Sequence, residues 1–295
     1  MITCSRRDWF GLAGFEPGLL FKTDRLYLLN SVGSTSDFLL GRQEPALGRS
    51  CRWTQWGWQA GGIHLIPAPK RPHAGTVVVA RRQPSGRGRQ GRTWLDVGGL
   101  QMSWTVQVSR DTVKSGLAVW TGLMVAMVLS EHFSLLVQLK WPNDLLIDGR
   151  KVGGLILDSP GQGSGGMVVA GLGINLVTPA GGFPAPLHGR ATSLHAESGR
   201  RVRPANVAGP VLSRLAQELP AFAEGGWAVF TQHLQRHDWL RDRRVEYLRN
   251  NERFEGLACG IDVDGALLLV DPTGQTERVL AGEVHLVASD RSGER

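Results

Sequence analysis

The sequence predicts an α+β protein in which a large mixed domain is followed by a small all-β domain. Three observations support this prediction. Short β-branched runs and helical periods share residues 25–240, and short strands separated by turns follow from about residue 242. A chain of 295 residues is also long enough for a large core and a small one. We therefore expect one domain over residues 1–241 and a second over 242–295.

The larger domain is expected to contain a sheet covered by helices. A strand over 25–29 leads through a polar turn into a helix capped by Ser or Thr. Residues 41–72 are rich in Gly, Pro, Arg and Trp without an apolar period, so we expect a long surface insertion there. A core helix is expected over 115–132. Further strands are predicted at 76–80, 100–108, 137–140, 145–147, 152–157 and 167–172, and amphipathic helices at 203–222, limited by Pro210 and Pro220, and at 227–240.

The C-terminal segment is expected to form a small β-barrel. Turns at Val263-Asp264-Gly265 and Pro272-Thr273-Gly274 separate its short apolar runs. Strands are predicted at 244–248, 254–261, 266–270 and 276–279, and residues 289–295 are expected to be a disordered tail.

Composition restricts the function classes without choosing one. No stretch of about 18 apolar residues occurs, so we expect a cytoplasmic protein without membrane association. Cys4, Cys51 and Cys259 are odd in number and widely spaced, which predicts neither a disulfide framework nor a metal site. The net charge of +7 favours acidic partners, whether nucleic acid, nucleotide phosphates or an acidic protein.

The most distinctive segment is the glycine–arginine loop GRGRQGRTW at residues 86–94. Its glycines allow the backbone to approach a ligand closely, and its arginines suit a phosphate or a carboxylate. Trp94 could stack on adenine. The loop also fits the G-x-G-x-x-G pattern with Asp111 twenty residues after Gly91, but no helix follows it to bind a pyrophosphate. A solvated basic loop or a nucleic-acid patch stays open as the alternative.

Two later segments carry polar groups at turns. KWPND at 140–144 followed by DGRKVGG at 148–154 predicts a hairpin that presents Asn143, Asp144 and Lys151. Taken alone, it is more typical of an ordinary hairpin with a surface lysine. GLGIN at 171–175 could admit a flat ring against its glycines, although a bulge and turn capped by Asn175 fits at least as well.

In this order along the chain, these segments together with Ser34-Thr35-Ser36 and Gln83 resemble the biotin protein ligases. The resemblance covers about residues 25–240, and the joint occurrence of GRGRxGRxW and KWPND is highly specific. Residues 265–269 and 282–284 are similar to the C-terminal domain of that family. The implied fold is a class II synthetase-like catalytic domain followed by a small SH3-like β-barrel.

The resemblance implies a ligase that activates biotin with ATP to biotinyl-5′-AMP. The biotinyl group would then pass to a lysine of a biotin carboxyl carrier protein or domain of acetyl-CoA carboxylase. Mg²⁺ is expected to accompany ATP through its phosphates, and we assign no protein ligand to a metal. The implied catalytic residues are Arg87, Lys151 and Asp144, with Asp144 orienting or deprotonating the acceptor lysine. Biotin would contact Ser34, Thr35, Ser36, Gln83, Arg87, Gly88, Arg89 and Lys151, and ATP would contact Arg92, Trp94, Asn143 and Asn175.

The chain departs from the family pattern in two places. Ser36 stands where the family usually has asparagine, so a hydroxyl replaces an amide that would bond the ureido ring. Residues 41–72 also exceed the family's usual connection and include three tryptophans. Because residues 1–22 show no two-helix pattern, we expect no specific DNA binding. Several family members dimerise by extending a sheet, and no residue here decides whether a homodimer forms.

Two rival functions share part of this pattern. A lipoate ligase uses related chemistry, but Gln83 and GRGRQGRTW favour biotin. A basic nucleic-acid-binding module would use the loop arginines but leaves residues 140–144 and Lys151 unexplained.

Overall fold

A computed structural model describes residues 9–10, 25–54, 57–109, 111–112, 116–160, 166–249, 252–280 and 282–287. The expected C-terminal tail lies outside these residues, and so do residues 1–22 apart from Trp9 and Phe10. No helix among the described residues is long and apolar enough to span a membrane.

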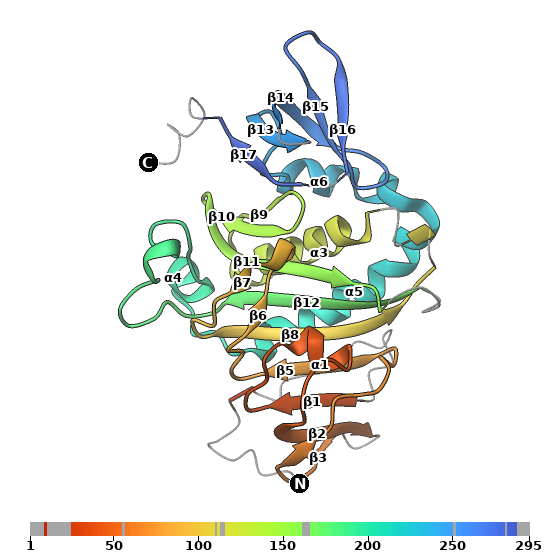
Figure 1. Ribbon diagram of the computed structural model, residues 1–295, viewed down its shortest axis with the longest axis vertical. Coiled ribbons are helices and arrows are strands. Elements are labelled where there is room, and N and C mark those ends of the chain that lie inside the picture. The colour runs from red at the N-terminus through yellow and green to blue at the C-terminus, as the bar shows by residue number, and fades with distance from the viewer. Residues whose placement is uncertain are drawn as a thin grey trace.

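A ten-stranded mixed sheet forms the centre of the larger domain (Figure 1). Its order is β3-β2-β1-β5-β8-β12-β11-β10-β9, with β4 also paired to β2. β1 and β5 are parallel, and the other neighbours are antiparallel. The strands are β1 (Arg25–Leu29), β2 (Ala46–Thr54), β3 (Gly57–Ala60), β4 (His64–Ile66), β5 (Thr76–Ala80), β8 (Gly99–Gln107), β9 (Val137–Lys140), β10 (Asp144–Ile147), β11 (Arg150–Asp158) and β12 (Met167–Asn175).

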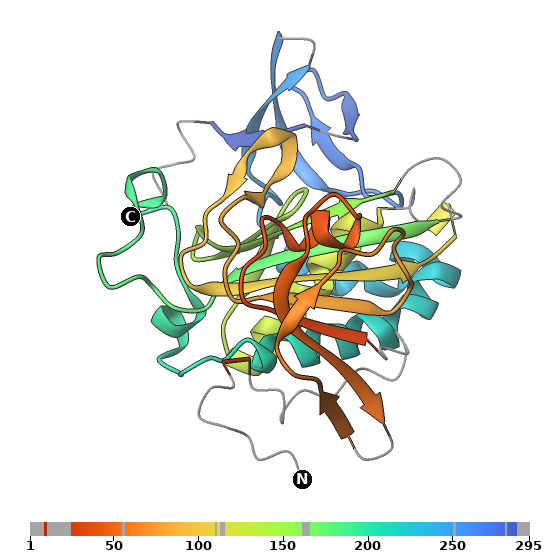
Figure 2. The ribbon, with the colours of Figure 1, turned by 60° about the horizontal axis from the view of Figure 1, so that its bottom comes forward.

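Helices cover the two faces of this sheet unequally (Figure 2). On one face α3 (Leu117–Phe133) packs on β9, β10 and β11, α5 (Ala205–Gly225) packs on β8 and on α3, and α6 (Thr231–His237) packs on α3 and the edge strand β9. The short α1 (Thr35–Leu39) packs on β5, β8 and β12 from the other side, while α4 (Leu194–Ser198) follows the 3-10 turn η3 (Ala185–Leu187). Most of the apolar core lies on the α3 side, while the α1 side combines a smaller apolar cluster around Phe38 and Leu39 with buried polar groups.

Strand β8 shows how sequence alternation divides the two faces. Leu100, Met102 and Trp104 belong to the apolar core beneath α3. The alternate residues Ser103 and Gln101 are also buried but are polar, and they face the α1 side. Successive side chains of a strand point to opposite faces, so this one strand supplies both core packing and the floor of a polar site.

Residues 41–72, which we expected to be a long surface insertion, contain the strands β2, β3 and β4. β2 pairs antiparallel with β1 from Arg25↔Arg52 to Leu29↔Gly48, and β3 and β4 extend the sheet beyond it. This pairing provides hydrogen-bond partners for the backbone groups along the outer side of β1. Backbone hydrogen bonding of this kind leaves no apolar period in the sequence, so the strands were not predicted.

Helix α5 also differs from the prediction, because it continues through Pro210 and Pro220 to Gly225. Each proline removes one backbone hydrogen bond, but packing compensates for the loss. Phe222 near its end stacks on Trp120 of α3 with ring centroids 4.8 Å apart. The segment predicted as one helix at 227–240 is instead the 3-10 helix η4 (Gly226–Phe230) followed by α6.

The C-terminal segment forms a separate five-stranded antiparallel sheet in the order β16-β15-β14-β13-β17. Its strands are β13 (Arg244–Arg249), β14 (Glu252–Ile261), β15 (Leu267–Val270), β16 (Thr276–Val279) and β17 (Val284–Leu286), of which β17 was not predicted. The turn before β15 meets the larger domain, where the buried Trp141 donates from Nε1 to the carbonyl of Gly265 at 2.9 Å. The small sheet is thus fixed beside the KWPND segment.

Candidate active site

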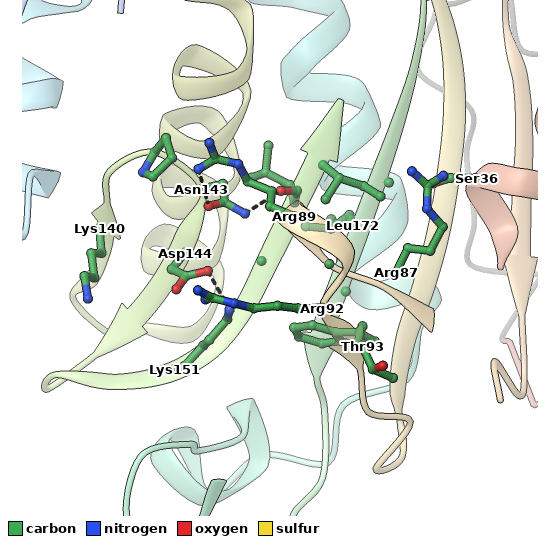
Figure 3. Close-up of a pocket in the computed structure, with 18 of the residues that line it drawn as sticks. Ser36, Arg87, Arg89, Arg92, Thr93, Lys140, Asn143, Asp144, Lys151 and Leu172 are labelled. Carbon is green, nitrogen blue, oxygen red and sulfur yellow. Dashed lines mark hydrogen bonds and ion pairs between the residues drawn. The ribbon is translucent and has the colours of Figure 1, made fainter. Parts of the chain in front are cut away.

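One cavity collects side chains from the larger domain (Figure 3) and from residues 282–285 of the C-terminal segment. Its walls are the α1 turn, the hairpin of β6 (Gly86–Arg87) and β7 (Thr93–Trp94), the turn that joins β9 to β10, the middle of β11 and β12, and residues 282–285. The predicted residues that line it are Ser34, Thr35, Ser36, Gln83, Arg87, Gly88, Arg89, Arg92, Trp94, Asn143, Asp144 and Lys151. Segments far apart in sequence therefore meet at one site.

Asn175 is the predicted site residue that does not line this cavity. Its Nδ2 donates to the carbonyl oxygens of Thr192 at 3.0 Å and Lys151 at 3.4 Å. The buried amide thus fixes the backbone that carries Lys151.

Buried hydroxyl and amide groups form one end of the cavity. Ser34 caps α1, because its Oγ accepts from the backbone N–H of Asp37. Thr35 donates to Gln83 Oε1 from its backbone nitrogen at 2.8 Å and from Oγ1 at 3.0 Å. Ser103 lies behind them, 2.7 Å from Thr35 Oγ1 and 3.0 Å from Ser36 Oγ. This end can therefore recognise a neutral polar ring.

The glycine–arginine loop is a short hairpin closed by the 3-10 turn η2 (Arg89–Gly91), in which Gln90 has φ 55° and Gly91 φ 75°. The helix that a dinucleotide-binding loop requires does not follow it.

Arg87 is held by two carboxylates. Its Nη1 lies 2.6 Å from Asp37 Oδ1 and 3.2 Å from Asp158 Oδ2. Although partial burial opposes the effect, Asp158 and Asp37 raise the pKa of Arg87 above its ordinary value. In Figure 3 its guanidinium lies on the side of the cavity opposite Lys151, beside Ser36. Arg87 thereby ties the hairpin to α1 and β11.

The other loop cations lie nearer the opposite end. Arg89 donates from Nη1 to Asn143 Oδ1 at 3.3 Å, and burial lowers its pKa. Arg92 forms an ion pair with Glu283, which comes from the C-terminal segment just before β17. These guanidinium groups suit the binding of phosphate oxygens.

Lys151 and Trp94 complete this end of the cavity. Lys151 Nζ lies 2.5 Å from Asp144 Oδ1 and 5.7 Å from the centre of the Trp94 ring. The ring also covers Gly173 so closely that a Cβ there would lie 2.5 Å from Trp94 Cε2. Asn143 is fixed separately by donation from Nδ2 to the Leu155 carbonyl at 2.8 Å. The cavity therefore presents a partly buried aromatic ring beside Lys151, Arg89 and Arg92.

Sequence reasoning missed four residues that shape this site, namely Ser103, Asp37, Asp158 and Glu283. Ser103 had a detectable signal, because polar residues alternate with apolar ones along β8. The three acidic residues had none, since each is brought to its arginine only by the tertiary fold. The described residues contain no cluster of three or more His, Cys, Asp or Glu side chains able to hold a metal ion.

Comparisons with known proteins place the chain in a family. The chain matches the Biotin/lipoate A/B protein ligase family over residues 68–175 and the Biotin protein ligase C terminal domain over residues 242–287. It is 32% identical to the biotin–[acetyl-CoA-carboxylase] ligase of Paracoccus denitrificans, over 67% of this chain and 85% of that protein. The corresponding Mycobacterium tuberculosis ligase is 31% identical over 71% and 78% of the two chains. The solved biotin protein ligase from Aquifex aeolicus in complex with biotin and ATP superposes with a TM-score of 0.69 and 26% identity, over 89% of this chain and 98% of that one. The chain belongs to the biotin protein ligase family.

Proposed function

We propose that this chain is a biotin–[acetyl-CoA-carboxylase] ligase, which makes biotinyl-5′-AMP from biotin and ATP and transfers the biotinyl group to a carrier lysine. The observation that carries the proposal is a single cavity with a neutral polar end at Thr35 and Gln83 and a cationic end at Arg89, Arg92 and Lys151. Biotin has the matching chemistry, with a neutral ureido ring at one end and a carboxylate at the other. The relatives' names and the Aquifex complex with biotin and ATP support the same two substrates.

The biotin subsite is assigned to the α1 end of the cavity. Ser34, Ser36 and Gln83 would bond the ureido ring, and Gly88 allows the hairpin backbone to lie against the ligand. Arg87 would hold that hairpin in place through Asp37 and Asp158. Arg89 and Lys151 would face the biotin carboxylate.

The nucleotide subsite is assigned to the opposite end. Trp94 offers its face to adenine, and Arg92 and Asn143 would contact the ribose and phosphates. Asn175 would contribute indirectly, through the backbone of Lys151.

The first step joins the two ligands. A biotin carboxylate oxygen attacks the α-phosphorus of ATP, an O–P bond forms, and the bond to pyrophosphate breaks. Arg89 and Lys151 would neutralise the two anions that must meet, which lowers the electrostatic barrier to their approach. Lys151 leaves its pairing with Asp144 as the ligand anions enter.

In the second step the acceptor lysine amine attacks the acyl carbon, an amide forms, and AMP leaves with the electrons of the O–C bond. Asp144 is the proposed group that orients this amine or accepts its proton, because it lines the cavity beside Asn143. Release from Lys151 would make its carboxylate available for that role.

Mg²⁺ is proposed to arrive with ATP. The carboxylates that line the cavity, Asp144 and Glu283, each already pair with a cation, so the phosphates would supply most of the ion's ligands. We further propose a cytoplasmic site of action and no specific DNA binding. A homodimer is compatible with the fold.

The function is tested by calorimetric titration with biotin and then lipoate, followed by pyrophosphate release on addition of ATP. We expect biotin-dependent release that Lys151→Ala abolishes. Lys70→Ala, which removes an exposed lysine outside the cavity, is the control and should act as wild type. Release driven by lipoate and not by biotin would overturn the assignment in favour of the related lipoate chemistry.

A further inference from the structure

Ser103 is a fully buried polar residue at the centre of the hydroxyl network. It belongs to β8, contacts the side chains of both Thr35 and Ser36, and does not itself line the cavity. Its chemical effect on a ligand must therefore be transmitted through those two neighbours.

The direction of each hydrogen bond in the network follows from the number of protons available. The backbone N–H of Thr35 can only donate, so the Gln83 atom 2.8 Å from it must be the carbonyl oxygen Oε1. The Thr35 hydroxyl, 3.0 Å from the same oxygen, must also donate to it. Thr35 has then used its only hydroxyl proton.

The remaining bonds are fixed in turn. At 2.7 Å from Thr35 Oγ1, Ser103 must donate its proton to that oxygen. At 3.0 Å from Ser103 Oγ, Ser36 must then donate its own proton to Ser103. The result is a one-way relay from Ser36 through Ser103 and Thr35 to Gln83.

This relay decides what the cavity offers to a ligand. Ser36 keeps only oxygen lone pairs and is an acceptor, whereas Gln83 has its Nε2 protons left and is a donor. Among the described residues Gln83 Nε2 has no protein partner, and Gln83 lines the cavity. Ser34 accepts from the Asp37 N–H, so its hydroxyl proton is also free to be donated.

We propose that Ser103 is a positioning residue that sets this polarity and thereby makes the cavity selective for a cyclic urea. The urea carbonyl would accept from Gln83 Nε2 and Ser34, and a urea N–H would donate to Ser36. The inference rests on the proposed function, since it deepens the assignment of the biotin end of the cavity. It also gives the hydroxyl of Ser36 a defined role as an acceptor.

The test is the dissociation constant of biotin for wild type, Ser103→Ala, Ser36→Ala and the double variant, measured by calorimetry. Without Ser103 the Ser36 proton loses its acceptor and can turn toward the ligand N–H, so we expect about tenfold weaker binding. Removing Ser36 should cost about the same factor. Because both changes act through one oxygen, the double variant should also lose about tenfold and not about a hundredfold.

Controls separate positioning from general destabilisation. Thr105→Ala removes another buried hydroxyl from the same face of β8, bonded to the His73 carbonyl, and should leave biotin affinity unchanged. Ser103→Thr keeps the hydroxyl and should retain near wild-type affinity for biotin. Ser103→Cys, which is closer to serine in size, should bind biotin as weakly as the alanine variant. For each of these Ser103 variants, kcat at saturating biotin should stay within about threefold of wild type.

The two possible failures are distinct. Wild-type affinity in Ser103→Ala, or a fully additive loss of about a hundredfold in the double variant, would overturn the relay. Biotin binding by the wild-type protein would still support the proposed function in that case. Absence of biotin binding by the wild-type protein would overturn both.

Discussion

Two glycines on one strand face separate the proposed substrate subsites, which allows each to be perturbed alone. Gly171 and Gly173 lie two residues apart on β12, and neither has a positive φ. A Cβ at Gly173 would lie 2.5 Å from Trp94 Cε2, whereas one at Gly171 would collide with Ser36 Oγ. We predict that Gly173→Ala weakens ATP binding and that Gly171→Ala weakens biotin binding.

The size of the effect follows from the overlap. Carbon atoms make favourable contact at about 3.5–4.0 Å, so the Trp94 ring must move by roughly 1 Å to accommodate alanine at Gly173. Stacking of a base on an aromatic side chain is worth about 1–3 kcal/mol. Partial loss of that stacking should raise the KM for ATP by at least about fivefold. The KM for biotin should change by less than about twofold.

Pyrophosphate release measured while each substrate is varied in turn provides the assay. Gly62→Ala is the matched control, because nothing lies within 4 Å of its added Cβ and its φ is not positive. It should leave both KM values unchanged. If Gly173→Ala raised the KM for biotin and spared that for ATP, the assignment of the Trp94 end to the nucleotide would be wrong.

Three further predictions concern stability, pH and the loop. Burial raises the pKa of Asp238 to about 6 from 3.8, so its folded state binds a proton more tightly than the unfolded chain does. The contribution of Asp238 to the free energy of unfolding is therefore fully present below about pH 4. It declines as pH rises to about 6, by about 3 kcal/mol at most. Asp238→Asn should remove this decline from chemical unfolding curves, and an identical pH slope in both proteins would refute it. Trp141→Phe leaves the Gly265 carbonyl unpaired and should cost about 1–3 kcal/mol in the free energy of unfolding, so an unchanged denaturant midpoint would contradict the coupling of the two sheets. Arg87→Ala should reduce biotin-dependent pyrophosphate release at least about tenfold. Thermal stability should fall little, because the partly exposed ion pairs of Arg87 contribute about 1 kcal/mol or less. Retained activity would show that the hairpin needs no such anchor.

Elements with a strong local pattern could be predicted from the sequence. All residues of β5 are buried, and its β-branched run predicted the bounds Thr76–Ala80 that the structure shows. The helix expected at 115–132 is α3, displaced by one or two residues because Gly116 and Ser134 adopt left-handed conformations at its ends. Here the hydrophobic period and the end signals agree.

Features that depend on tertiary partners could not be predicted. β2 carries exposed arginines such as Arg49 and Arg52 beside the buried Cys51, so its apolar pattern is weak although β1 gives it a full set of hydrogen bonds. Asn175 was expected at the nucleotide, but the carbonyl groups of Lys151 and Thr192 occupy its amide. Spacing along the chain does not reveal such competition between protein and ligand for one polar group.

The cationic character of the loop was visible in the sequence, but its electrostatic state in the folded chain was not. Arg87 is paired with Asp37 and Asp158, Arg92 with Glu283, and Lys151 with Asp144. Without ligand, these carboxylates neutralise much of the charge that would otherwise repel across a small cavity.

An entering phosphate or carboxylate must therefore replace an internal carboxylate as the partner of a cation. The free-energy cost of this exchange differs among the cations. Arg92 and Lys151 each have one carboxylate partner at the edge of the cavity, so both can turn to a ligand after breaking a single ion pair. Arg87 would have to leave two carboxylates, one of them in a forked contact through both Nη atoms. This difference is the physical reason for assigning anion binding to Lys151, Arg89 and Arg92, and anchoring of the hairpin to Arg87.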